Sequence, residues 1–232
     1  MTRLGGLGIR VLLLGSILGF MGCGGPRDPV LEMQKALASA PEYMITLEDM
    51  REEGSFFPKY YHRYKVVQGE RAKETGWVEV SEDVFQRYEP FLGMALVAKS
   101  DQGVNNTPHP AGYHYVGNSQ YGQWENRGGN SFWVFYGQYS LMRNMLGYGG
   151  RSIYRSDYDD YRSYRQRRTP YFGKNREWGT SGSVTKQQKP SVFARRKAAL
   201  AQKNRSFTQK VQSRTGRSYS GFGSRSRGGF GK

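Results

Sequence analysis

The chain has 232 residues, 37% of them hydrophobic, and carries 35 Lys and Arg against 19 Asp and Glu, which gives a net charge of +16. This length allows one or two domains. Its single cysteine excludes an internal disulfide framework and a cysteine-based zinc site.

The charge is divided unevenly along the chain. Residues 1–150 hold 14 basic and 15 acidic side chains, a net charge of −1, whereas residues 151–232 hold 21 basic and 4 acidic ones, a net charge of +17. After Glu177 there are 13 Lys and Arg and no acid. This shift predicts a nearly neutral body followed by a cationic tail. Such a tail either keeps the protein soluble or binds a polyanion, because complex formation releases condensed counterions.

Residues 1–22 have the pattern of a secretory signal peptide. Arg3 and Arg10 form a short basic region, and residues 11–20 (VLLLGSILGF) form an apolar run. The run is too short to span a bilayer as a helix, which needs about 20 apolar residues. The sequence therefore predicts an exported chain.

The only cysteine, Cys23, follows this apolar run directly, in the string GFMGC. The arrangement resembles the lipobox of bacterial lipoproteins, with Gly22 at the small position before the lipidated cysteine. The resemblance implies acyl chains, palmitate among them, on Cys23 and a place in the bacterial cell envelope. Because Gly24 and not Asp follows the cysteine, it favours the outer membrane if the cell has one. An unlipidated cysteine in an ordinary signal peptide is the alternative.

The next elements predict a small α+β domain. Residues 23–42 form a leader and a short helix, in which Asp28 is the N-cap, Pro29 opens the first turn and the end lies near Ser39. Alternating or β-branched runs predict strands at 43–47, 60–67 and 76–80. A helix capped by Ser81 ends before Pro90, and residues 91–98 form a buried strand or helix. Residues 43–100 are a small core, which we expect to recruit apolar groups from the following segment.

The second part of the body, up to residue 150, begins with turn signals. Residues 101–131 predict a long ordered loop. Residues 131–146 predict an amphipathic helix capped by Asn130 or Ser131 and closed by Gly147, because the apolar residues recur at spacings of three and four.

Three pieces follow the body. Residues 151–180 are rich in Tyr and Arg at helical spacing. Residues 174–190, which overlap the end of this segment, have the composition of a polar linker. Residues 181–232 are predicted to form a largely disordered tail with a helix near 192–211. That helix has the composition of a basic amphipathic helix at an anionic surface. The candidate residues for binding anionic lipid, lipopolysaccharide or a cell-wall polymer are Arg195, Arg196, Lys197, Lys203, Arg205, Lys210, Arg214, Arg217, Arg225 and Arg227.

Two other functions remain open at this stage. His109 and His114, five residues apart, are the side chains best suited to proton transfer or metal binding in a secreted enzyme or metal-binding protein. The Arg- and Gly-rich end is also typical of segments that bind single-stranded nucleic acid, although export would separate it from cytosolic RNA. No Walker, Rossmann, HExxH or GxSxG motif is present, and no cofactor is expected.

The run Ser131-Phe132-Trp133 and the end Arg227-Gly228-Gly229-Phe230-Gly231 are similar to an uncharacterised family of bacterial lipoproteins. That family carries no assigned activity, so the resemblance implies no catalytic residues. The sequence therefore predicts a non-enzymatic, lipid-anchored envelope protein whose cationic tail contacts an anionic surface.

Overall fold

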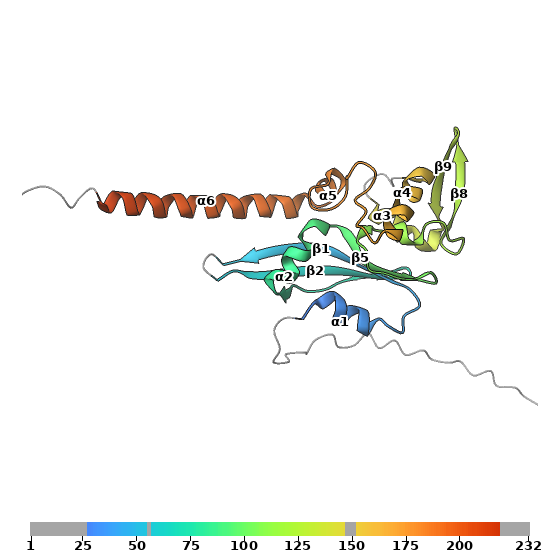
Figure 1. The fold of residues 1–232 in the computed structure, drawn as a ribbon, viewed down its shortest axis with the longest axis horizontal. Helices are drawn as coiled ribbons and strands as arrows, with labels where there is room; N and C mark the ends of the chain where they lie inside the picture. The colour runs from blue at the N-terminus through green and yellow to red at the C-terminus, as the bar shows by residue number, and fades with distance from the viewer. Residues whose placement is uncertain (1–26, 55–56, 147–151, 219–232) are drawn as a thin grey trace, which may run out of the picture.

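The computed structural model describes residues 27–54, 57–146 and 152–218 and confirms the α+β class (Figure 1). A seven-stranded antiparallel sheet and a three-stranded sheet are combined with short helices, and one long helix projects from them. The predicted signal peptide, Cys23, Arg225 and Arg227 lie outside the described residues.

The large sheet has the strand order β3-β2-β1-β5-β6, with β4 paired to β2 and β7 paired to β5. The strand bounds are β1 Tyr43–Glu53, β2 Lys59–Gln68, β3 Arg71–Glu74, β4 Val78–Val80, β5 Met94–Ser100, β6 Gly103–Asn105 and β7 His109–Pro110. The three strands that the sequence predicted at 43–47, 60–67 and 76–80 are therefore present as β1, β2 and β4.

The β1–β2 hairpin extends well beyond its neighbour. The pairing of β1 with β5 ends at Thr46 and Ala95, whereas its pairing with β2 continues to Glu53 and Lys59. The register shifts between Leu47 and Asp49, where Glu48 forms a bulge. The far half of the hairpin therefore projects from one end of the body (Figure 1).

Both faces of the large sheet are covered. On one face α1 (Pro29–Ala36) and α2 (Glu82–Tyr88) pack over an aliphatic cluster that contains Ile45, Leu47 and Leu96. The predicted N-caps are confirmed, because the Asp28 side chain accepts a hydrogen bond from Val30 N and the Ser81 side chain accepts one from Val84 N. The turn η1 (Glu89–Phe91) then leads into β5.

The opposite face of the large sheet is covered by an aromatic cluster from the later part of the chain. The predicted recruitment of apolar groups is confirmed, since Met44 and Ala98 of the sheet belong to the same cluster as Tyr113, Tyr161 and Trp178. The segment predicted as a long loop supplies β6, β7, η2 (Tyr113–Tyr115) and the start of β8 (Gly122–Arg127). The helix α4 (Arg155–Gln166) turns Tyr161, which is 2% exposed, into this cluster.

The prediction of one helix over residues 131–146 is wrong. Residues Asn130–Phe135 form strand β9, and only η3 (Gly137–Tyr139) and α3 (Ser140–Met145) are helical. The strand β9, which is rich in aromatic and β-branched residues, pairs with β8 on one side and with β10 (Ile153–Tyr154) on the other. A turn at Gly128 and Gly129, both with positive φ, connects β8 to β9. Alternation buries Trp133 and Phe135, so the strand period prevails over the helical spacing.

The predicted linker over 174–190 is also wrong, because its few apolar side chains complete the core. Trp178, Val184 and Thr185 are 3%, 3% and 0% exposed, and the last two lie on α5 (Ser183–Gln188). The helix expected at 192–211 is present and longer, as α6 (Pro190–Ser218). Residues 183–188 and 190–218 are therefore helical in the part of the chain that the structure describes.

Candidate anionic-surface site on α6

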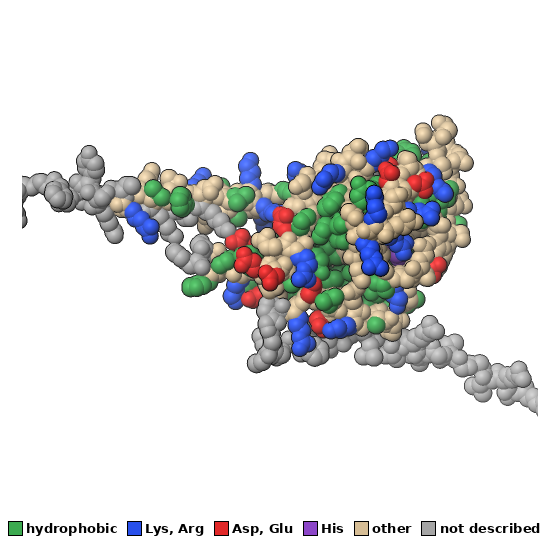
Figure 2. Space-filling model, in the orientation of Figure 1, with side chains coloured by type: hydrophobic (Ala, Val, Ile, Leu, Met, Phe, Trp, Pro, Cys, Tyr) green, Lys and Arg blue, Asp and Glu red, His purple; other side chains and the backbone are tan. Residues whose placement is uncertain are grey.

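The helix α6 combines the features of the candidate site. Its 29 residues contain no acid and span about 44 Å at 1.5 Å per residue. It leaves the body beside α5 and continues past the β1–β2 hairpin (Figure 1). In Figure 2 basic side chains lie along α6, whereas acidic ones gather over the α2 and hairpin part of the body.

The first turns of α6 are fixed to the body, and we call this part the α6 root. Val192 is 4% exposed and packs with Phe193 against the aliphatic cluster. Arg195 Nη2 lies 2.5 Å from Asp49 Oδ2, and Arg196 Nη2 lies 2.7 Å from Glu89 Oε1. Both arginines were predicted to bind an external anion, but the structure engages them with acids of the body.

The residue before the helix, Lys189, adds a third ion pair at the α6 root. Its Nζ lies 2.5 Å from Glu48 Oε1, and Lys65 Nζ lies 3.2 Å from Glu48 Oε2. Burial alone would raise the pKa of Glu48, but the two ammonium groups outweigh burial and hold this pKa below its usual value. Glu48 is therefore ionised at neutral pH, and its bulge position presents it to both lysines.

Beyond the root, three of the predicted cations extend into solvent. Lys197, Arg205 and Arg214 are exposed and form no ion pair with an acid among the described residues. Lys203, Lys210 and Arg217 lie on the same helix, and their side chains are outside the description. Six of the ten predicted residues therefore lie on the part of α6 that extends beyond the body, and α6 contains no acidic residue.

Three apolar side chains accompany these cations, and we call them the distal stripe: Leu200, Phe207 and Val211, which are 61%, 69% and 43% exposed. Leu200 and Phe207 follow Phe193 by 7 and 14 residues, so they lie on the same side of the helix. The body covers Phe193 but ends before the distal stripe. The stripe is therefore the uncovered continuation of the α6–body interface.

The two histidines that we considered for catalysis are part of the core. His109 is 0% and His114 2% exposed, with ring centroids 6.1 Å apart among tyrosines. Burial, with a smaller contribution from the charge of Arg165, lowers the pKa of His109 to about 4 and that of His114 to about 3. Both are neutral near pH 7 and therefore cannot deliver a proton there.

The contacts of these histidines are structural. His109 Nδ1 donates to Thr107 O at 2.8 Å, and His114 Nε2 lies 3.0 Å from the Oγ of Ser100, which is 4% exposed. A substrate has no access to this Ser–His pair. In the described ranges no group of three His, Cys, Asp or Glu is placed to hold a metal ion.

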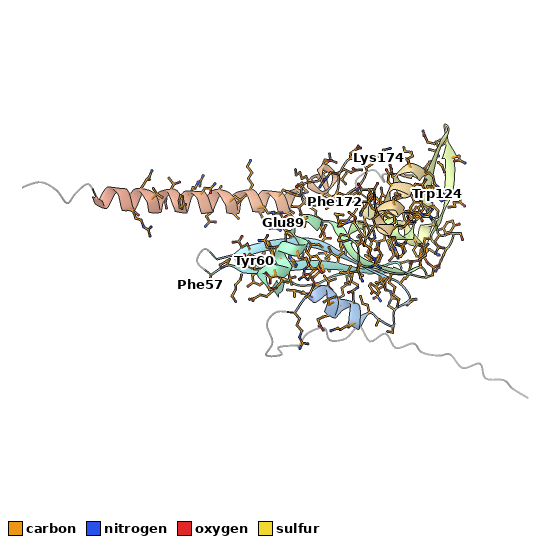
Figure 3. The ribbon with its side chains drawn as sticks, in the orientation of Figure 1. Phe57, Tyr60, Glu89, Trp124, Phe172 and Lys174 are labelled. Atoms are coloured by element: carbon orange, nitrogen blue, oxygen red, sulfur yellow. The ribbon has the colours of Figure 1, made fainter. Side chains whose placement is uncertain are left out.

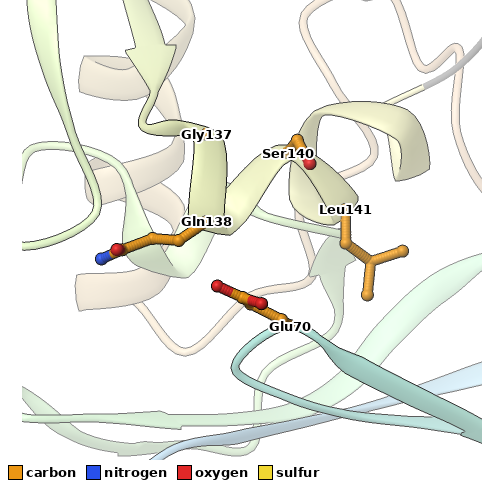
Figure 4. Close-up of a pocket in the computed structure, with 5 residues that line it drawn as sticks. All are labelled: Glu70, Gly137, Gln138, Ser140 and Leu141. Carbon is orange, nitrogen blue, oxygen red and sulfur yellow. The ribbon is translucent and has the colours of Figure 1, made fainter.

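A depression on the surface offers no catalytic set either. It has a volume of about 450 Å³, is open to solvent, and is lined by Glu70, Gly137, Gln138, Ser140 and Leu141 (Figure 4). Its single carboxylate has no partner acid or base in the lining, so it lacks the paired groups that acid–base or nucleophilic catalysis needs.

No family model, no curated protein and no solved structure matches this chain. Within residues 27–54, 57–146 and 152–218, no helix is long and apolar enough to cross a membrane. The residues of the chain itself therefore carry the functional argument.

Proposed function

We propose that the protein is a non-enzymatic, lipid-anchored component of the bacterial envelope, held by Cys23, whose helix α6 binds the anionic phospholipid surface of a membrane. The observation that carries this proposal is the exposure of the distal stripe next to uncompensated cations on an acid-free helix. A basic face attracts anionic headgroups, and the apolar side chains enter the boundary between headgroups and acyl chains.

The magnitudes favour lipid contact by this helix. Each Lys or Arg near an anionic membrane contributes about 1 kcal/mol, so Lys197, Arg205 and Arg214 together contribute about 3 kcal/mol. Cys23 precedes Asp28 by five residues, which span at most about 18 Å. So short a tether gives the body an effective concentration near the bilayer in the millimolar range, at which even weak contacts are occupied.

The test is co-sedimentation of the chain from residue 23 on, with Cys23→Ser, with vesicles of phosphatidylcholine and phosphatidylglycerol. Replacing Lys197, Arg205 and Arg214 by Gln should weaken binding about a hundredfold at low salt, and high salt should weaken the parent in the same direction. The matched control replaces Arg71, Lys73 and Arg143, three exposed cations of the body, by Gln.

Equal losses in both triple variants, or binding that does not respond to salt, would contradict the proposal. Tighter binding to single-stranded RNA than to the vesicles at the same salt concentration would favour the nucleic-acid alternative instead.

A further inference from the structure

A second part of the molecule projects from the same end as α6, namely the tip of the β1–β2 hairpin. Phe57 is labelled there in Figure 3, and its side chain is 90% exposed. Among the described residues no other large hydrophobic side chain is so exposed. Burial of such a side chain in a hydrocarbon phase is worth several times the thermal energy, so an apolar contact at this tip would be favourable.

The backbone holds Phe57 in this position. Gly54 has φ +88°, and a Cβ there would lie 2.8 Å from Phe57 O, so the hairpin end is tight. Pro58 has a fixed φ and restricts the backbone of Phe57. The side chain is therefore presented at low entropic cost.

The two cations next to Phe57 are both paired with acids, in a part of the hairpin where acids outnumber bases. Arg51 Nε lies 3.2 Å from Glu53 Oε1 across the start of the tip, and Lys59 Nζ lies 3.5 Å from Glu79 Oε2. Neither cation is left to attract an anionic surface by itself. Any contact made by the tip is therefore apolar, in contrast to the charge-driven contact of α6.

We propose that Phe57 is a second membrane-contact residue, which inserts into the same phospholipid bilayer that α6 binds. This inference rests on the proposed function. Two features favour a bilayer over another occupant: the distal stripe is exposed at the same end of the molecule, and Cys23 tethers that molecule to a membrane (Figure 1). Together, a fixed hairpin and a fixed helix would set the orientation of the body, which a flexible lipid tether alone leaves free.

The two contacts differ in their response to salt, which separates the two proposals. In the Cys23→Ser background, Phe57→Ser should weaken vesicle binding about tenfold at both low and high salt, because apolar burial is not screened. Val104, which is 48% exposed on β6, provides the matched control: Val104→Ser should leave binding unchanged.

Spin labelling gives a direct readout of membrane insertion, because the chain has no cysteine other than Cys23. In the Cys23→Ser background, Phe57→Cys and Val104→Cys each supply the only thiol for a nitroxide label. With vesicles bound, a label at position 57 should become shielded from aqueous relaxation agents, and a label at position 104 should stay accessible.

If the parent binds vesicles but Phe57→Ser binds equally well and the label at position 57 stays in water, the inference about Phe57 is wrong and the proposed function stands. If the parent does not bind at all, both proposals fail. If Phe57→Ser dissociates a dimer of the protein in the absence of lipid, the occupant of the tip is a second copy and the bilayer assignment is overturned.

Discussion

Lowering the pH from 7 to 5 should destabilise the fold strongly, because three histidines are buried without charge. His62, His109 and His114 are 0%, 0% and 2% exposed. Burial lowers the pKa to about 4 for His62 and His109 and to about 3 for His114, against 6.5 in an unfolded chain. Between pH 6.5 and pH 4 the histidines of the unfolded state are therefore protonated, whereas those of the folded state are not.

The sign and the size follow from this difference. Stability is fully present above pH 6.5 and is lost as the pH falls toward 4, because each of the three pKa values is depressed by folding. Between pH 7 and pH 5 each histidine costs about 2 kcal/mol, and the three together cost about 6 kcal/mol. That is a large part of the 5–15 kcal/mol or so by which domains are stable.

The measurement is urea unfolding followed by tryptophan fluorescence at several pH values between 7 and 5. The series stops at pH 5 because Glu48, whose pKa is lowered by its lysine partners, starts to lose stabilisation below its usual value of 4.5. Replacing His62 by Gln, which can still reach the Tyr64 hydroxyl 2.9 Å from His62 Nδ1, should reduce the pH-dependent loss by about a third. A free energy of unfolding that changes by less than about 1 kcal/mol over this range would refute the reasoning.

Three further outcomes are expected. Cys23→Ser should convert the protein from one that resists a high-salt wash of the membrane fraction into one that the wash releases, with intact mass showing the loss of acyl chains; a mutant that resists the wash as the parent does, with its mass explained by the substitution alone, would oppose lipidation. Trp178→Ala should lower the free energy of unfolding by about 3–5 kcal/mol, checked by urea melts, because it leaves a cavity under the sheet. Amide exchange should show protection through α5 and the α6 root but little near Val211, and uniform protection along α6 would contradict its projection into solvent.

The elements with strong local signals could be predicted from the sequence. Asp28 with Pro29, and Ser81 with the acids that follow it, define helix starts within one or two residues, and these were confirmed. The run from Phe132 to Phe135 fits both the start of a helical spacing and a strand pattern, and only the partner strand β8 decides between them. Such pairing is a long-range property, which a local period cannot show.

The candidate site, like the fold, could be predicted from the sequence only in part. The cations and apolar side chains of α6 could be found from composition and spacing. The ion pairs of Arg195 and Arg196 with the body could not, because their partners Asp49 and Glu89 lie 146 and 107 residues earlier. The contribution of Trp178 to the core was missed for the same reason, since its neighbours in sequence are polar.

The late position of Trp178 and Val184 has a consequence for biosynthesis. Met44 and Ala98 share one cluster with these two side chains, so the core cannot close until residue 184 has left the ribosome. At about 5–20 residues per second, the interval between the synthesis of β1 and that of α5 is roughly 7–30 s. During this time the sheet lacks one of its coverings, and the nascent chain remains extensible. The export that we propose requires a chain that has not yet closed its core, and the order of these residues along the chain provides that delay.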